Sequence, residues 1–71
     1  MTEAPVVVMR TPSYRTWALR STRAEAWLLT RGLWAWRVWE VLGSVKHAGG
    51  TEIGVRRASA AALAALVEHA S

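Results

Sequence analysis

The segment that decides the fold of this chain lies near its middle and is rich in tryptophan. It reads Trp27-Leu28-Leu29-Thr30-Arg31-Gly32-Leu33-Trp34-Ala35-Trp36-Arg37-Val38-Trp39 and holds four of the five tryptophans of the 71-residue sequence. Such a run suits a hydrophobic core, a platform on which nucleic-acid bases stack, or a segment that lies on a membrane surface. The choice depends on whether the segment is helical or extended.

The first part of this region carries signals of a short helix. Thr22 and Glu25 have the spacing of a capping box, in which two side chains satisfy the free N–H groups of a helix start. Apolar residues follow at helical spacing until Gly32, a residue typical of the position after a helix end. The pattern therefore predicts a helix over residues 22–32.

The second part, residues 33–45, is compatible with two structures. Apolar residues continue at helical spacing to Val45, so one long helix over residues 22–45 is an alternative. Gly32 and Gly43 oppose it, because a glycine inside a helix costs about 1 kcal/mol relative to alanine. As a strand, the segment would place Trp39 and Val45 on one face. We favour the strand.

The N-terminal part predicts a β-hairpin. The runs 6–10 and 14–20 are rich in residues that favour strands, and Thr11-Pro12-Ser13 separates them. Proline supplies a turn here and cannot donate to a strand ladder.

The C-terminal part predicts a second hairpin and a helix. A three-residue loop of Ala48, Gly49 and Gly50 would pair Val45 with Ile53 and give both faces of the hairpin a consistent character. The second strand of this hairpin would run over residues 51–57. A helix is expected from Ser59, its N-cap, to about residue 70, with an apolar stripe formed by Leu63, Leu66, Val67 and Ala70.

Together these elements predict an α+β fold in one domain, residues 1–71, with the order ββαββα. About four antiparallel strands would form a sheet, with two helices on one face. The uncovered face is where we expect function to lie. No stretch carries a motif specific enough to indicate a family.

Composition favours an acidic partner. The formal charge is +4, and eight of the nine basic residues are arginine, whose planar guanidinium suits phosphate and carboxylate groups. The chain has no cysteine, so disulfides and thiolate metal sites are excluded. Asp, Asn, Gln and Phe are also absent, and a GC-rich genome would give a similar bias without selection for binding.

The sequence shows neither a cleavable signal pattern nor a membrane span. A span needs about 20 apolar residues, and the longest uncharged stretch, residues 58–67, is half as long. A cytoplasmic location is therefore expected.

Arginines near the two predicted helix starts are candidate binding residues. Arg20 and Arg23 flank the first start, and Arg56 and Arg57 flank the second. Free N–H groups at a helix N-terminus, together with arginines, would form clamps for phosphates. Arg10 and Arg15 lie outside both starts and are expected to matter less.

Two tryptophans and an arginine complete the candidate binding surface. Trp34 and Trp36 do not fit the apolar faces that hold the other tryptophans, so we expect them to be exposed beside Arg37. Exposed in this way they would stack on bases or form an interface hot spot. Burial in a core or a homodimer is the alternative.

Catalysis is not expected. His47 and His69 lie far apart in the sequence, the five glutamates have no paired arrangement, and no glycine-rich loop matches a phosphate-binding motif. No cofactor or metal is predicted.

The expected function is therefore binding. The favoured hypothesis is a small basic inhibitor or adaptor that contacts an acidic protein or nucleoprotein machine of a host, of the kind phages and mobile elements encode, anti-CRISPR proteins among them. The alternatives are a DNA- or RNA-binding module with arginine clamps and stacking tryptophans, and a membrane-surface peptide that would require the long helix.

Overall fold

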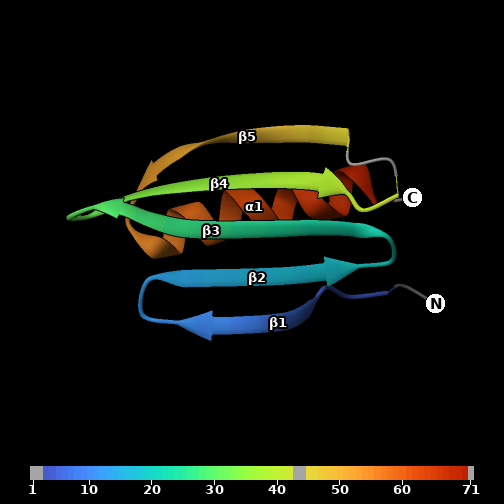
Figure 1. The fold of residues 1–71 in the computed structure, drawn as a ribbon, viewed down its shortest axis with the longest axis horizontal. Coiled ribbons are helices and arrows are strands. Elements are labelled where there is room, and N and C mark those ends of the chain that lie inside the picture. The colour runs from blue at the N-terminus through green and yellow to red at the C-terminus, as the bar shows by residue number, and fades with distance from the viewer. Residues whose placement is uncertain (1–2, 43–44, 71) are drawn as a thin grey trace.

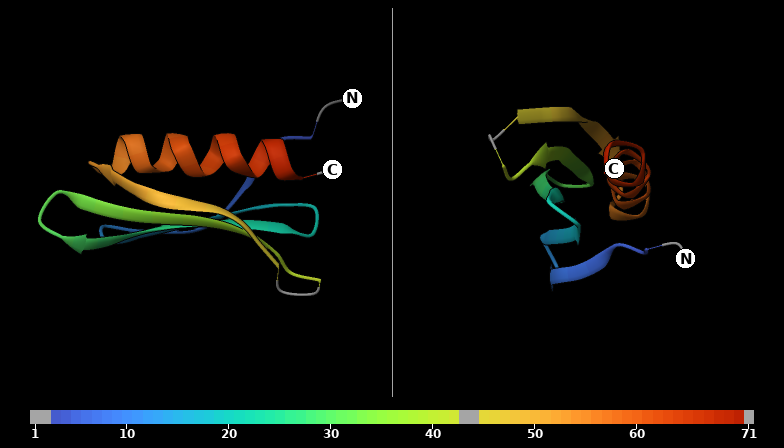
Figure 2. Two further views of the ribbon diagram at one scale, coloured as in Figure 1. Left: turned by 90° about the horizontal axis from the view of Figure 1, so that it is seen from above. Right: turned by 90° about the vertical axis from the view of Figure 1, so that its right-hand side faces the viewer.

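The computed structural model describes residues 3–42 and 45–70, which form a five-stranded sheet followed by a helix (Figure 1). The elements are β1 (Val6–Thr11), β2 (Tyr14–Leu19), β3 (Thr22–Thr30), β4 (Leu33–Glu40), β5 (Val45–Ile53) and α1 (Val55–His69). Each strand pairs antiparallel with the next along the chain. The molecule has two layers, with α1 on one face of the sheet (Figure 2).

The helix covers part of its sheet face. It packs on β3, β4 and β5, contacts β2 less, and does not pack on β1 within the described residues. Five strands about 4.8 Å apart span about 19 Å, whereas a helix with its side chains is about 10 Å wide. β1 and the adjoining side of β2 are therefore left without a helix above them in the described part of the chain.

Small side chains hold the two layers together. Ala24 and Ala26 of β3 and Ala58 and Ala62 of α1 are completely buried. Alanine at such a contact lets the helix approach the sheet closely, and the tight packing stabilises both elements. The larger members of the core are Trp17, Leu19, Trp34, Val38 and Leu66.

The predicted helix over residues 22–32 is wrong, and so is the alternative helix over residues 22–45. Residues 22–30 form β3, so the structure has one helix and five strands instead of two helices and four strands in its described part. Both faces of β3 are buried in its first half: Ala24 and Ala26 lie under α1, and Glu25 lies on the other face. A strand buried on both faces lacks alternation, which explains why the helical spacing was misleading.

The two residues of the predicted capping box have other partners. The Thr22 hydroxyl donates to Oε2 of Glu40 on β4 at 3.4 Å. Glu25 accepts hydrogen bonds from Tyr14 and Arg37 on the neighbouring strands. Both side chains thus link strands.

Gly32 ends β3 as it was expected to end a helix, but it does so in a hairpin turn. Its φ is +75°, and the turn joins Thr30 to Leu33 across the β3–β4 pair. The strand predicted for residues 33–45 is confirmed over Leu33–Glu40. Gly43 lies outside the described residues.

The N-terminal hairpin is confirmed, and the C-terminal prediction is wrong in detail. β1 and β2 pair on either side of Pro12. The segment 48–50 is not a loop but the middle of β5, opposite residues 36–38 of β4. Val45 pairs with Glu40, and Ile53 pairs with Leu33.

The final helix begins five residues earlier than expected, because its N-cap is Gly54 and not Ser59. The predicted strand over residues 51–57 stops at Ile53, and α1 starts at Val55 after Gly54, whose φ is +90°. Ser59 is therefore inside the helix and is not its N-cap. No helix in the described residues is both long and apolar enough to cross a membrane.

Candidate functional site

The part of the helix-side face that α1 leaves uncovered carries side chains of β1 and β2. Val7 lies opposite Trp17, and Arg10 lies opposite Arg15. The register shifts between Val7 and Met9, which puts Val7 and Arg10 on the same face although they are three residues apart. The bulge therefore brings an apolar and a basic side chain together beside α1.

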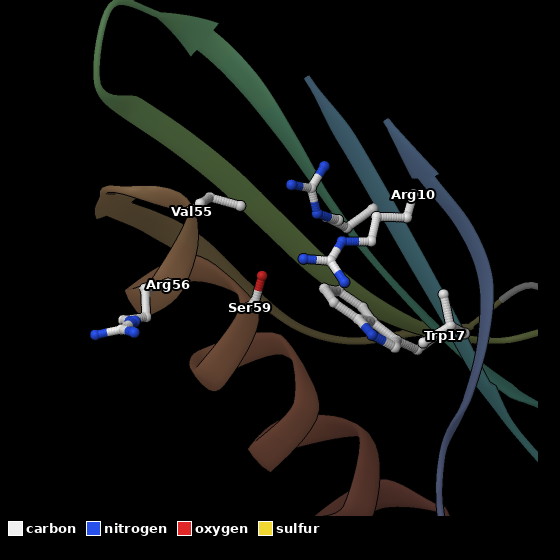
Figure 3. Close-up of a pocket in the computed structure, with 7 residues that line it drawn as sticks. Arg10, Trp17, Val55, Arg56 and Ser59 are labelled. Atoms are coloured by element: carbon white, nitrogen blue, oxygen red, sulfur yellow. The ribbon is translucent and has the colours of Figure 1, made fainter. Parts of the chain in front are cut away.

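A basic cavity lies between these strands and the start of α1 (Figure 3). Its volume is about 290 Å³. Trp17 and Arg10 line it from the sheet, and Val55, Arg56 and Ser59 line it from the helix. Val7 and Arg15 complete the lining.

The three arginines of this cavity have no acidic partner among residues 3–42 and 45–70. Arg15 is held in place, because its guanidinium lies 5.8 Å from the centroid of the Trp34 ring and donates to the backbone oxygen of Tyr14 at 3.2 Å. Arg10 and Arg56 are exposed. The lining contains no carboxylate in the described part of the chain, and the first turn of α1 has no acidic residue. Arg56 lies in the first turn of α1 with its side chain directed away from Trp17 (Figure 3), and Arg10 and Arg15 line the cavity from the sheet. Their three charges and the helix N-terminus together create a positive potential that favours an anionic ligand.

An apolar extension of the basic cavity runs toward the C-terminal end of α1. It shares Val7 and Trp17 with the cavity, and its volume is about 580 Å³. The rest of its lining is Pro5 before β1 and Leu63, Ala64 and Val67 on α1. We call the cavity and this extension together the groove.

The opposite sheet face carries a hydrogen-bonded network. Glu25 lies opposite Arg37, and its carboxylate accepts hydrogen bonds from the Arg37 guanidinium and the Tyr14 hydroxyl. Burial raises the pKa of Tyr14 to about 12, and the hydrogen bond to Glu25 and the charge of Glu25 act in the same direction, whereas the charge of Arg37 opposes them. Arg37 also lies over the Trp39 ring, 4.8 Å from its centroid. The network ties three strands together.

The four arginines predicted as phosphate clamps are not brought together. Arg20 lies at the β2–β3 turn, where it pairs with Glu3 at 3.2 Å, and Arg23 donates to backbone oxygens beside it. Arg56 and Arg57 lie in the first turn of α1, at the other end of the molecule (Figure 1). Arg20 and Arg23 do not flank a helix start, because β3 replaces the first predicted helix.

Trp17 is buried as expected, whereas the other four tryptophans lie on the faces opposite to those expected. Trp34 is 5% exposed and belongs to the core, and Trp36 packs against that core on the helix side of the sheet. Trp27 and Trp39 were expected to point inward. They lie with Arg37 on the sheet face opposite α1 and are partly buried. A strand in place of the predicted helix changes which residues share a face.

Sequence reasoning missed Arg10 and Arg15 as site residues. They lie far from Arg56 in the sequence, and the fold places all three around one cavity. A weak signal was present, because two arginines that flank a predicted turn at 10 and 15 are suitably spaced to face each other in a hairpin.

His47 of β5 and His69 of α1 form a stacked pair. Their ring centroids are 4.8 Å apart and the rings are parallel to within 1°. No group of three or more potential metal ligands occurs among residues 3–42 and 45–70. The pair connects the last turn of α1 to the edge strand.

Comparison with protein-family models, with curated proteins and with solved structures found no match.

Proposed function

We propose that this chain is a small non-enzymatic binding protein that contacts an acidic protein surface through the groove, as an inhibitor or adaptor of a larger assembly. The observation that supports the proposal is the combination, on one face, of an apolar extension and three arginines that have no acidic partner in the described part of the chain. Protein interfaces concentrate their binding energy in arginine and tryptophan residues surrounded by apolar contacts. Arg10 and Arg56 provide the arginines here, and Val7 and Val67 provide exposed apolar contacts beside them.

The three arginines of the groove restrict the charge of a partner that can bind there. A basic partner would place its charges against three guanidinium groups and would be repelled. An uncharged apolar partner would leave the arginines desolvated and unpaired, which is costly. A partner with carboxylates beside an apolar patch satisfies both parts of the groove.

Affinity capture with matched charge variants tests the proposal. The tagged protein, an Arg10→Ala/Arg56→Ala variant and an Arg31→Ala/Arg57→Ala control would each be incubated with nuclease-treated lysate of the native host. Both variants lose two charges, and Arg31 and Arg57 are exposed residues outside the groove lining. We expect a protein that is retained by the wild type and the control and lost by the groove variant. Equal retention by all three would contradict the proposal.

A nucleic acid is the second candidate partner, and the other sheet face favours it. Arg23, Trp39 and Lys46 are aligned across β3, β4 and β5 on that face, beside Arg37. Sheets with basic and aromatic side chains bind nucleic acids by phosphate contacts and base stacking. Gel shifts at low salt with Arg23→Ala and Lys46→Ala test this candidate. Binding would weaken with salt by a slope of about 0.7 to 0.9 for each phosphate contact, and each substitution would lower that slope.

A further inference from the structure

We infer that the groove binds one amphipathic helix of the partner, laid antiparallel to α1, with acidic residues in its C-terminal turn. This inference rests on the proposed function and adds the shape, the direction and the charge pattern of the bound element. It follows from three properties of the groove: its width, its length and the uneven distribution of charge along it.

The width of the sheet leaves room for one helix. The sheet spans about 19 Å and α1 occupies about 10 Å of it, so a second helix fits beside α1 over β1 and β2. Trp17 of β2 would lie beneath that helix, and it is the residue that the basic and apolar parts of the groove share with Val7. An extended strand would fill about half of this width and leave apolar surface exposed.

The length of the groove corresponds to three helical turns. Its wall on α1 is formed by Arg56, Ser59, Leu63 and Val67, which recur every three or four residues and therefore share one face. From position 56 to position 67 a helix rises about 17 Å. A helix of about eleven residues would contact the whole wall through an apolar stripe at positions i, i+3 or i+4, and i+7.

Charge sets the direction of the bound helix. Arg10, Arg15 and Arg56 lie at the N-terminal end of α1, whereas the lining at the other end is Pro5, Leu63, Ala64 and Val67. A helix antiparallel to α1 would place its C-terminal turn at the arginines. The free carbonyl groups of that turn carry partial negative charge, and acidic side chains there would pair with the guanidinium groups.

Selection from a displayed library of helical peptides tests the inference. The library would hold fourteen-residue alanine-based helices, about three to four turns, with random residues at the positions of one stripe and in both terminal turns. The immobilised bait would be the full chain. Selected peptides would then be titrated against the wild type, Ala64→Glu and Ala60→Glu, and against Arg10→Ala and Arg57→Ala. Both alanines are exposed on α1, and Ala64 lines the groove whereas Ala60 does not.

We expect enriched peptides to carry an apolar stripe and acidic residues in the C-terminal turn. Their affinity should fall about tenfold or more with Ala64→Glu and with Arg10→Ala, the loss expected for one charge-assisted contact or one blocked contact site. Ala60→Glu and Arg57→Ala should change it less than twofold. Enrichment of acidic residues in the N-terminal turn, binding that survives Ala64→Glu, or no enrichment would each overturn the inference.

The outcome is separable from that of the proposed function. If capture of an acidic partner depends on Arg10 and Arg56 but does not respond to Ala64→Glu, and the library yields no helix, the proposed function stands and the helix is excluded. If neither capture nor selection depends on the groove, both fail.

Discussion

Three side chains on the sheet face opposite α1 show how a buried charge is accommodated in so small a protein. Glu25 is 8% exposed although α1, the helix of the described residues, lies on the other face of the sheet. A buried carboxylate is costly unless it is paired and hydrogen-bonded, and Tyr14 and Arg37 meet both conditions. Arg37 is held in turn by the Trp39 ring. The network explains why a glutamate is compatible with the middle of a strand.

Titration of Tyr14 reports on this network. The chain has one tyrosine, so tyrosinate absorbance follows a single group. The pKa is raised from 10.0 to about 12. Below pH 10 the phenol is protonated in both the folded and the unfolded chain, and its stabilising contribution is complete. Between pH 10 and 12 the unfolded chain ionises first, so we expect the free energy of unfolding to decrease over that range.

The Glu25→Gln variant separates the causes of this shift. Removal of the charge should lower the pKa of Tyr14 part of the way toward 10, with the remaining shift due to burial. Glu3→Gln is the control, because Glu3 is an exposed residue that pairs with Arg20. An unchanged titration of Tyr14 in Glu25→Gln would show that the charge of Glu25 does not raise the pKa of Tyr14.

At the scale of elements, turn residues and small side chains determine where strands end and how closely layers pack. Gly32 has a φ of +75° at the β3–β4 turn, and no atom lies within 4 Å of a Cβ added there. The requirement is therefore conformational and not steric. The requirement at Ala58 and Ala62 is steric, because both are fully buried between α1 and the sheet.

Substitution of Gly32 should act through the backbone alone. Gly32→Ala should lower the free energy of unfolding by about 1 kcal/mol, because an L residue with a side chain is disfavoured at positive φ. Gly32→Asn should lose less, since asparagine tolerates this conformation. Denaturant unfolding of the two variants measures the difference, and equal losses would contradict the assigned turn.

Enlargement of Ala62 should disrupt the helix–sheet contact. Ala62→Leu should cost about 1 to 3 kcal/mol through overpacking. Ala60→Leu adds the same atoms to α1 at an exposed position. Its free energy of unfolding should stay within about 0.5 kcal/mol of the wild-type value. Thermal or denaturant unfolding distinguishes them. If the two variants were equally stable, α1 would not pack on the sheet through this face.

At the scale of the whole molecule, stability should be unevenly distributed. α1 packs on β3, β4 and β5, whereas residues 6–10 of β1 are all exposed. Local opening requires little free energy where few apolar groups are buried. We expect amide hydrogens of β1 to exchange with solvent well before those of β3 and β4, as measured by hydrogen-exchange mass spectrometry. Uniform protection across the sheet would contradict this distribution.

The same asymmetry positions the candidate site. A helix over one half of the sheet leaves Val7, Arg10 and Arg15 without a helix above them, beside the buried Trp17, and the start of α1 adds Arg56. If the groove binds a helix as inferred, β1 should become more protected from exchange when a selected peptide is bound. Absence of such protection would place the peptide elsewhere.

The sequence by itself determined the first hairpin, the presence of a C-terminal helix and the basic character of the chain, and it favoured the strand that the structure shows at Leu33–Glu40. These follow from local causes: Pro12 stops a ladder, and an alanine-rich segment favours a helix. Only the tertiary structure decided that residues 22–30 are a strand. Alanine and glutamate favour helices locally, but Ala24 and Ala26 serve as the surface against which α1 packs, and burial of that contact outweighs local preference. Local sequence patterns also could not place Arg10 and Arg15 near Arg56, which is about forty positions away. These residues meet because of the strand order of the sheet and because α1 returns across it.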